Sequence, residues 1–345
     1  MRKVAHIFAS NAVHNSGDFM IGKAYKKYFE EVVKNEGEMQ FTNIDCRNET
    51  YFKERVEELN KFDYIVIGGG GLILPDSVPN DLSCWQWVIS KENILKIKKP
   101  IYVLSIGYNL FYNQDMTMYD RETSVSKEER LGIFRDSIET LIEKSEKFTM
   151  RHNNDVVKLR EIVREQYRSK IEYEKCATVW YVNKYWKHNF NKEGKKYIGI
   201  EIKDDREWRR YYKITKPVFY KELERVVDFC KEQQIEVVFF SHDGSSNFVK
   251  YLKSKNKDIH VLYNNSGNEE HIMQNYSKIK VMICCAGHSQ MISNGCGIKT
   301  LSLVTHPKVK SYCEDIGDNN FIEVNKVKES SEISQFVINK LQLED

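Results

Sequence analysis

The chain alternates short apolar runs with longer segments in which apolar and polar residues recur at helical spacing. Almost every position in the short runs is apolar and many are β-branched, as is typical of strands buried on both faces of a parallel sheet. The expected strands are Val4–Ala9, Tyr64–Ile67, Ile101–Ile106, Phe148–Arg151, Tyr197–Ile202, Glu236–Ser241, Ile259–Tyr263, Lys280–Cys285 and Thr300–Val304. The helical segments between them include Met20–Lys34, Glu128–Lys147 and Lys216–Gln233.

Such alternation predicts parallel sheets joined by right-handed crossovers. The pattern breaks down over 169–194, where an aromatic and basic stretch follows neither period. A length of 345 residues suits two domains. We therefore predict an α/β fold of two Rossmann-like, doubly wound parallel-sheet domains facing across a cleft, the GT-B architecture. The predicted N-terminal domain covers 1–170, the linker 171–194 and the C-terminal domain 195–345.

Composition narrows the class of protein. Hydrophobic residues make up 41% of the chain, enough for sizeable cores. Basic and acidic residues number 53 and 50, a balance that argues against a nucleic-acid partner. Eight cysteines are scattered without a CxxC motif, which favours reduced core cysteines in a cytoplasmic protein. No apolar stretch is long enough to cross a membrane as a helix.

Two glycine-containing loops follow predicted strands, where open parallel sheets bind their ligands. In Asn15-Ser-Gly17-Asp18 the glycine permits the turn into a helix, and Asp18 is expected at the N-cap. Gly68–Gly71 is a run of four glycines, each of which costs backbone entropy. Close approach of a ligand or of the opposing domain explains the run best, so we expect Gly69, Gly70 and Gly71 to line the cleft. Asp76, shortly after, is expected either to reach a sugar hydroxyl or to serve as a turn carboxylate.

Positively charged side chains follow other predicted strands. Arg151 ends one strand and can hold a phosphate or carboxylate bidentately. Lys203 and Arg206 follow the first strand of the second half, although acidic neighbours in that loop can neutralise them. Lys308 follows a late strand and supplies a further positive contact. A purely structural surface role remains the alternative for each of these cations.

His288 is the most specific candidate for a functional residue. It follows a strand of buried type and two small residues, and it opens a helix that continues with Ser289. A histidine at a helix N-terminus in a cleft can donate to an anion or shuttle a proton. No group of residues has metal-ligand spacing, so no metal is expected.

Taken in order, these segments resemble the polysaccharide pyruvyl transferase family. Asn15, Gly17 and Asp18 match its N-x-G-D loop, Gly68–Gly71 its glycine-rich turn, and Phe148–Arg151 a strand that ends in arginine. Its late segment is matched by Ala286–Gly295, Leu301–Val304 and Lys308–Gly317. The resemblance covers roughly residues 5 to 317.

The resemblance implies transfer of the enolpyruvyl unit of phosphoenolpyruvate onto a sugar of a cell-surface polysaccharide precursor, which forms a pyruvate ketal. The acceptor is then a sugar or a lipid-linked oligosaccharide bound by the N-terminal domain, and no cofactor is needed. In this interpretation His288 is catalytic. The donor is bound by Arg151, Lys203, Arg206, Ser289 and Lys308.

Two departures from the family pattern keep other interpretations open. Ala286 and Lys203 stand where the family usually has arginine, and lysine cannot reproduce the planar guanidinium fork. The first alternative is a glycosyltransferase that uses a nucleotide-sugar donor in glycan biosynthesis. The second is a non-catalytic glycan-binding relative. The stretch Trp180–Phe190 suits glycan stacking or peripheral contact with the inner face of a membrane.

Overall fold

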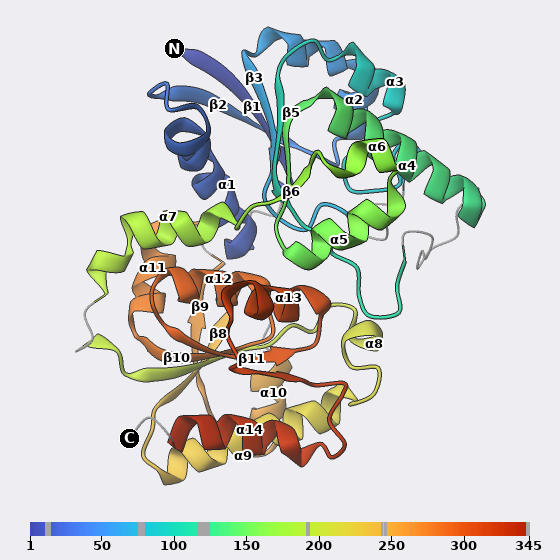
Figure 1. The fold of residues 1–345 in the computed structure, drawn as a ribbon. Helices are drawn as coiled ribbons and strands as arrows, with labels where there is room; N and C mark the ends of the chain where they lie inside the picture. Colours follow the sequence, from blue (N-terminus) through green and yellow to red (C-terminus); the bar gives the residue numbers. More distant parts are fainter. Residues whose placement is uncertain are drawn as a thin grey trace. The chain divides into compact units, whose positions relative to one another are not determined.

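The computed structural model describes residues 1–10, 15–74, 80–115, 125–190, 194–242, 244, 247–265 and 267–342. The chain forms two compact units, each built on a six-stranded sheet in which every pair of neighbouring strands is parallel (Figure 1). Unit 1 comprises Met1–Ala12 and Ile21–Ala177, and unit 2 comprises Val13–Met20 and Thr178–Asp345.

The sheet of unit 1 has the order β2-β1-β3-β4-β5-β6. Its inner strands are apolar on both faces because helices cover both, and Ile65, Val66 and Ile67 of β3 are fully buried. The strands are β1 (Arg2–Phe8), β2 (Met39–Asp45), β3 (Tyr64–Gly68), β4 (Ile101–Ile106), β5 (Ser145–Met150) and β6 (Ile171–Tyr173).

Helix α1 (Ser16–Tyr28) lies on one face of this sheet and continues as a short π-helix, Phe29–Lys34 (Figure 1). The other face is covered by the remaining helices of the unit, and Phe134 and Ile138 of α4 belong to its core. These helices are α2 (Glu49–Glu54), the 3-10 helix η2 (Val56–Lys61), α3 (Lys91–Lys96), α4 (Lys127–Lys144), α5 (Asn153–Ile162) and α6 (Glu165–Arg168).

The sheet of unit 2 has the order β12-β11-β10-β7-β8-β9. Its strands are β7 (Tyr197–Glu201), β8 (Val237–Ser241), β9 (His260–Tyr263), β10 (Ile279–Cys284), β11 (Lys299–Val304) and β12 (Phe321–Glu323). The helices are α7 (Ala177–Tyr185), the 3-10 helix η3 (Lys187–Asn189), α8 (Glu207–Arg210), α9 (Lys216–Glu232), α10 (Asn247–Ser254), α11 (Glu269–Ser277), α12 (Gly287–Gly295), α13 (Pro307–Ile316) and α14 (Ser331–Gln342). Helices α9 and α14 cover one face, and α11, α12 and α13 the other (Figure 1).

The predicted fold class of two doubly wound parallel-sheet domains is confirmed. Each predicted strand has an observed counterpart, although β5 begins and ends earlier than predicted. Three observed strands were not predicted: β2, β6 and β12. Strand β2 is an edge strand whose Gln40, Thr42 and Asn43 are polar, and the other two strands are only three residues long.

The segment 171–194, expected to be irregular, contains strand β6 and helix α7, and the boundary between the two units at Ala177 and Thr178 falls within it. Helix α7 has a buried and an exposed side: Tyr181 and Val182 are buried, whereas Lys184 is exposed. The many aromatic residues of this segment hide that pattern in the sequence. The Tyr181 hydroxyl and the Trp186 indole N–H both donate to Glu269 Oε1, at 2.6 and 2.8 Å. These aromatic side chains therefore pack within unit 2.

All eight cysteines lie in the described part of the chain, and all are buried and free of disulfides. Among the described helices, none is both long and apolar enough to cross a membrane. Asp76 and residues 116–124 of the long loop after β4 lie outside the described residues.

Candidate functional site

The first turn of α1 belongs to unit 2, where it lies against His288. Helix α1 begins at Ser16, and Asn15 Oδ1 accepts a hydrogen bond from the Gly17 N–H at 3.0 Å. Asn15 therefore caps the helix, and the prediction that Asp18 is the N-cap is wrong. Asp18 lies instead in the first turn, where a carboxylate interacts favourably with the helix dipole.

Gly17 lies directly against the imidazole of His288. A Cβ atom built on Gly17 would be 1.6 Å from His288 Nδ1, so only glycine allows this approach. His288 Nε2 is 4.0 Å from Asp18 Oδ1, and these two side chains are 22% and 21% exposed. The structure thus brings Gly17, Asp18 and His288, which are far apart in the sequence, into one cluster.

His288 is also the second residue of α12. The N-cap residue Ala286 makes no side-chain capping bond, and the first turn carries no acidic residue. The N-cap residue therefore leaves the first free N–H groups of this helix uncapped, at the positive end of the helix dipole. Lys308 approaches the same turn, because its Cε is 3.9 Å from the Cβ position of Gly287. His288, Lys308 and the helix end can together hold an oxyanion.

Glu201 shapes the turn that presents His288. It ends β7, is 1% exposed, and its Oε2 accepts hydrogen bonds from the N–H groups of Cys285 and Ala286, at 3.2 and 3.0 Å. This carboxylate fixes the backbone between β10 and α12. Sequence reasoning missed Glu201, although a carboxylate that ends an otherwise apolar strand is a usable signal.

His242 is a second histidine that sequence reasoning missed. It follows β8, is 2% exposed, and its Nδ1 is hydrogen-bonded to Ser16 Oγ. Its Nε2 lies 2.8 Å from Ser289 Oγ and 3.1 Å from the Tyr276 hydroxyl. Ser289, expected to bind the donor, is fully buried against His242. The signal that identified His288, a polar residue just after a predicted strand, identifies His242 equally well.

Lys203 and Arg206 follow β7, which pairs with β10 in the sheet, so they lie at the same sheet edge as His288. The Tyr211 hydroxyl donates to the carbonyl of Lys203 at 2.8 Å. Arg206 has a left-handed backbone with φ of 52° and precedes α8. Arg210, the last residue of α8, is buried and pairs with Asp205 at 2.9 Å, so its role is structural.

The glycine run of unit 1 is explained largely by packing within that unit. Gly69 and Gly70 have φ of 81° and 85°, which side chains rarely adopt. A Cβ on Gly69 would be 2.1 Å from Ile21 Cγ2, and one on Gly71 would be 2.5 Å from Asn109 Cγ. A ligand is therefore not needed to account for this run, and ligand contact by Gly69, Gly70 and Gly71 stays a prediction.

Arg151 directly follows β5 and is 4% exposed. Its guanidinium lies against Gly107, where a Cβ would be 2.5 Å from Nη2. Arg151 belongs to unit 1, whereas Lys203, Arg206 and Lys308 belong to unit 2. The structure therefore divides the predicted donor-binding residues between the two units.

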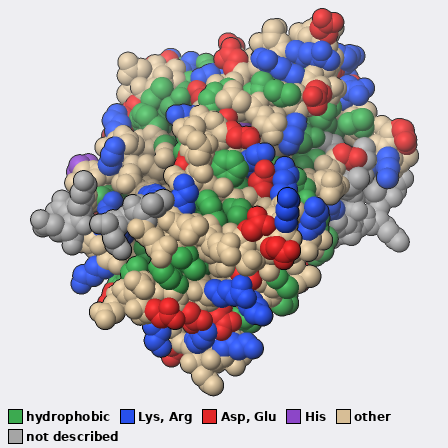
Figure 2. Space-filling view, turned by 60° about the horizontal axis from the view of Figure 1, so that its bottom comes forward, with side chains coloured by type: hydrophobic (Ala, Val, Ile, Leu, Met, Phe, Trp, Pro, Cys, Tyr) green, Lys and Arg blue, Asp and Glu red, His purple; other side chains and the backbone are tan. Residues whose placement is uncertain are grey.

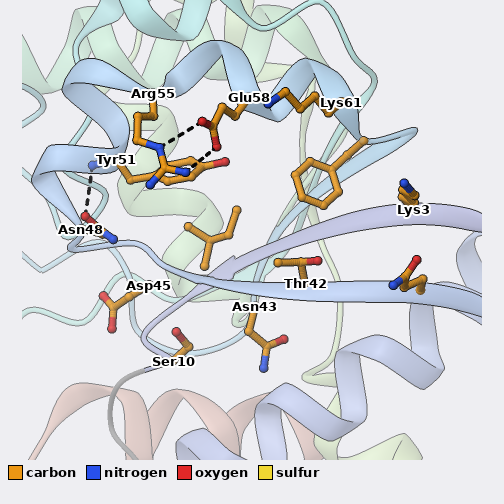
Figure 3. Close-up of a pocket in the computed structure, with 13 residues that line it drawn as sticks. Lys3, Ser10, Thr42, Asn43, Asp45, Asn48, Tyr51, Arg55, Glu58 and Lys61 are labelled. Carbon is orange, nitrogen blue, oxygen red and sulfur yellow. Dashed lines mark hydrogen bonds and ion pairs between the residues drawn. The ribbon is translucent and has the colours of Figure 1, made fainter.

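Unit 1 also has an open pocket of about 600 Å³ between β2 and the α2–η2 segment (Figure 3). Three of its charged groups are paired: Arg55 donates to both oxygens of Glu58, and Asp45 accepts at both oxygens from the neighbouring Arg47. None of the predicted site residues lines it, so we assign it no function. The lining residues are Lys3, Ser10, Gln40, Thr42, Asn43, Ile44, Asp45, Asn48, Tyr51, Arg55, Glu58, Lys61 and Phe62.

Comparison with known proteins identifies solved structures with a similar fold. The chain matches no family model and no curated protein. It is similar to the solved structure of S. aureus MnaA with UDP, at 13% identity and a TM-score of 0.53 over 100% of this chain and 89% of that one. It is also similar to a Listeria monocytogenes protein described as a UDP-N-acetylglucosamine 2-epimerase, at 10% identity and a TM-score of 0.55 over 99% and 88%.

A third similar structure is an α-glucosyltransferase in complex with UDP and a DNA 13-mer. It shares 12% identity and a TM-score of 0.50, over 100% of this chain and 91% of that one. At these identities the likeness shows the fold alone. Together with the two six-stranded parallel sheets, it shows that the chain has the GT-B fold.

These findings correct the predicted family. The resemblance to polysaccharide pyruvyl transferases is wrong: the similar structures are UDP-N-acetylglucosamine 2-epimerases and a glucosyltransferase, and no family model supports it. Phosphoenolpyruvate was expected as the donor only because of that resemblance, so this expectation no longer has support. The physical reason is that Asn15 caps α1, and that Gly17 and Gly69 allow close packing of neighbouring side chains. These roles are the same whatever substrate the protein binds. The matching residues therefore do not identify the donor.

Proposed function

We propose that this protein is a glycosyltransferase of glycan biosynthesis that uses a nucleoside-diphosphate sugar, whose diphosphate binds to unit 2 at the N-terminus of α12. The observation that carries the proposal is the approach of two basic side chains, His288 and Lys308, to this helix end, which has no capping side chain. Helix N-termini at the carboxyl edge of a parallel sheet are favourable places for phosphate groups.

The chemistry of glycosyl transfer needs positive charge at this place. The acceptor hydroxyl oxygen forms a bond to the anomeric carbon, while the bond from that carbon to the phosphate oxygen breaks. The acceptor proton passes to a base, and negative charge collects on the departing nucleoside diphosphate. Cationic side chains and helix N–H groups that face the diphosphate stabilise this charge, and they do so most strongly where water is excluded.

Asp18 has a supporting role in the proposal. Its Oδ1 is 4.0 Å from His288 Nε2, close enough for the carboxylate to help orient the imidazole toward the diphosphate site. Gly17 fixes the imidazole from the other side, so the ring cannot move toward α1 without a backbone shift.

Uridine nucleotides are the first ligands to test, because two of the similar structures, S. aureus MnaA and the α-glucosyltransferase, hold UDP. The experiment is a thermal-shift and calorimetric titration with UDP, UDP-glucose, UDP-N-acetylglucosamine and GDP-mannose, with CMP-sialic acid, which lacks a diphosphate, and phosphoenolpyruvate for contrast. A ligand at 100 times its Kd stabilises the folded state by about 2.7 kcal/mol. We expect one nucleotide sugar to produce such a shift.

The matched variants are His288→Ala and His260→Ala. His260 is an exposed histidine on β9 of the same unit, so its removal controls for the loss of a histidine. We expect His288→Ala to abolish the shift and His260→Ala to retain it. Absence of binding by every nucleotide, or equal binding by both variants, contradicts the proposal.

Turnover then separates the remaining possibilities. Acceptor-dependent release of the nucleoside diphosphate, with a new glycoside detected by mass spectrometry, supports a transferase. Conversion of the nucleotide sugar into an epimer without an acceptor, followed by proton NMR, supports an epimerase instead. Nucleotide binding with neither product supports a non-catalytic binding protein.

A further inference from the structure

We propose that unit 1 carries a separate oxyanion site built around Arg151, and that this site holds a phosphate or carboxylate group of the sugar acceptor. The assignment of the anion to the acceptor rests on the proposed function. The binding of an oxyanion at Arg151 rests on the structure of unit 1 alone.

The first observation is a buried cation that lacks a hydrogen-bond partner. Arg151 is 4% exposed, and no residue in the described part of the chain accepts a hydrogen bond from its buried Nε. No described carboxylate forms an ion pair with its guanidinium. Burial of an unpaired charge is unfavourable, so a guanidinium held in this way is suited to an anion that arrives with a ligand.

Asp155 is the carboxylate that acts on Arg151 through space. It is 2% exposed, and burial raises its pKa even though His152 and Arg151 act in the opposite direction. One of its oxygens, Oδ2, accepts a hydrogen bond from the Tyr108 N–H at 3.0 Å. Asp155 thus offsets part of the charge without using the hydrogen-bonding face of the guanidinium.

The backbone beside Arg151 is strained in a way that shapes the site. Ser105 near the end of β4 is buried and has φ of 45°, and the pairing of β4 with β5 shifts register between Val103 and Ile106. Bulges and strained residues of this kind concentrate at functional sites. The chain then passes Gly107, whose missing Cβ leaves room for the guanidinium.

Asn109, two residues after Gly107, is a second buried polar residue of unit 1 with an unsatisfied atom. Its side chain packs on Gly71, and its Oδ1 is buried without a hydrogen-bond partner in the described structure. An amide oxygen of this kind accepts from a sugar hydroxyl, while the guanidinium fork matches two oxygens of a phosphate or carboxylate. A sugar that bears a phosphate or carboxylate therefore fits Arg151 better than a neutral sugar does.

The test uses the full chain saturated with the nucleotide that it binds, and calorimetric titration with four probes. The probes are inorganic phosphate, glucose 1-phosphate, glucuronate and glucose. Glucose 1-phosphate and glucuronate separate a phosphate group from a carboxylate, and glucose measures the contribution of the neutral sugar. We expect at least one charged probe to bind and glucose to bind much more weakly.

Three variants locate the binding. Arg151→Gln removes the charge, and Gly107→Ala keeps the charge but places a methyl group 2.5 Å from Nη2 of the undisturbed side chain. Arg2→Gln is the control, because Arg2 lies in the same unit and its side chain is 60% exposed. Loss of one charge-assisted contact predicts affinity for the charged probe roughly 10- to 100-fold weaker in the first two variants and unchanged in the third.

The affinity for the nucleotide separates this proposal from the proposed function. We expect it to be unchanged in Arg151→Gln and lost in His288→Ala. Binding of no charged probe to the wild type, or equal binding to wild type and Arg151→Gln, overturns the oxyanion site. Loss of the nucleotide in Arg151→Gln overturns its assignment to the acceptor, because Arg151 then serves the donor.

Discussion

Gly17 and His288 show how the candidate site depends on the absence of a side chain. Alanine is a better helix former than glycine, so helix propensity alone favours alanine at position 17 of α1. The Cβ would nevertheless lie 1.6 Å from His288 Nδ1, and the ring would have to move. The position of the imidazole is therefore determined by a residue that is distant in the sequence.

We predict that Gly17→Ala weakens nucleotide binding by about tenfold or more, because a displaced His288 loses a contact worth roughly 1.5–3 kcal/mol. Overpacking is also expected to lower the free energy of unfolding by about 1–3 kcal/mol. Calorimetric titration and chemical denaturation measure the two effects. Gly132→Ala is the control: position 132 lies in α4 with no atom within 4 Å of the new Cβ, so it should stabilise the protein by about 0.5–1 kcal/mol. Unchanged nucleotide affinity in Gly17→Ala contradicts the prediction.

His6 in β1 makes the stability of unit 1 depend on pH. It is fully buried, its Nε2–H donates to the Gly68 carbonyl at 3.1 Å, and burial lowers its pKa from 6.5 to about 4. The unfolded chain therefore binds a proton between pH 6.5 and 4 that the folded chain does not bind. The stabilising contribution is complete above pH 6.5 and is lost as the pH falls toward 4.

We predict that the wild type loses about 2–3 kcal/mol of unfolding free energy from this residue between pH 7 and pH 4.5. His6→Gln keeps a donor for the Gly68 carbonyl but cannot titrate, so its stability should fall less over the same interval. Urea denaturation at the two pH values gives the difference. Parallel pH profiles for wild type and variant would falsify the assignment.

At the scale of elements, the turn between β10 and α12 depends on a residue of β7. Glu201 accepts the N–H groups of Cys285 and Ala286, and these hydrogen bonds set the direction in which α12 begins. Glutamine has the same shape, but it accepts more weakly than a carboxylate and carries an amide N–H₂ group in place of one oxygen. The start of α12 is thus held by a side chain of the neighbouring strand β7 rather than by the side chain of its own N-cap residue.

We predict that Glu201→Gln lowers the free energy of unfolding at pH 7 by about 1.5–3 kcal/mol, the range for hydrogen bonds to a charged group. Nucleotide affinity should fall with it, because α12 presents His288. Denaturant titration and calorimetry test both parts. Full stability together with full affinity in the variant contradicts this account of the turn.

Hydrophobic pattern predicted the strands that lie inside the sheets, because a strand buried on both faces has few polar positions. It missed β2, β6 and β12 because edge position or short length removes that signal. Among site residues, His288 was predictable from its place after a strand. Its contact with Gly17 was not predictable, because 271 positions separate the two residues and only tertiary structure joins them.

At the scale of the whole molecule, charge limits the class of partner. The chain carries a net charge of only +3, and the face seen in Figure 2 shows Lys and Arg side chains interspersed with Asp and Glu. Proteins that bind nucleic acid concentrate basic residues on one face. One of the similar structures holds a DNA 13-mer, so DNA binding by this chain is worth a direct test.

We predict no saturable binding of duplex DNA in fluorescence anisotropy at physiological salt. Non-specific DNA binders have a Kd of about 10⁻⁴–10⁻⁶ M under these conditions. Saturable binding in that range, with the steep salt dependence of phosphate contacts, would contradict this prediction. It would mean that basic residues are concentrated on one surface despite the balanced composition.

We propose that unit 2 binds a nucleoside diphosphate at the N-terminus of α12. Hydrogen exchange followed by mass spectrometry, with and without saturating UDP, tests it directly because it reports where the nucleotide protects the backbone. The account predicts protection concentrated in peptides that cover residues 16–18 and 286–290, and its absence in His288→Ala. Protection confined to other segments, or equal protection in the variant, would contradict the claim.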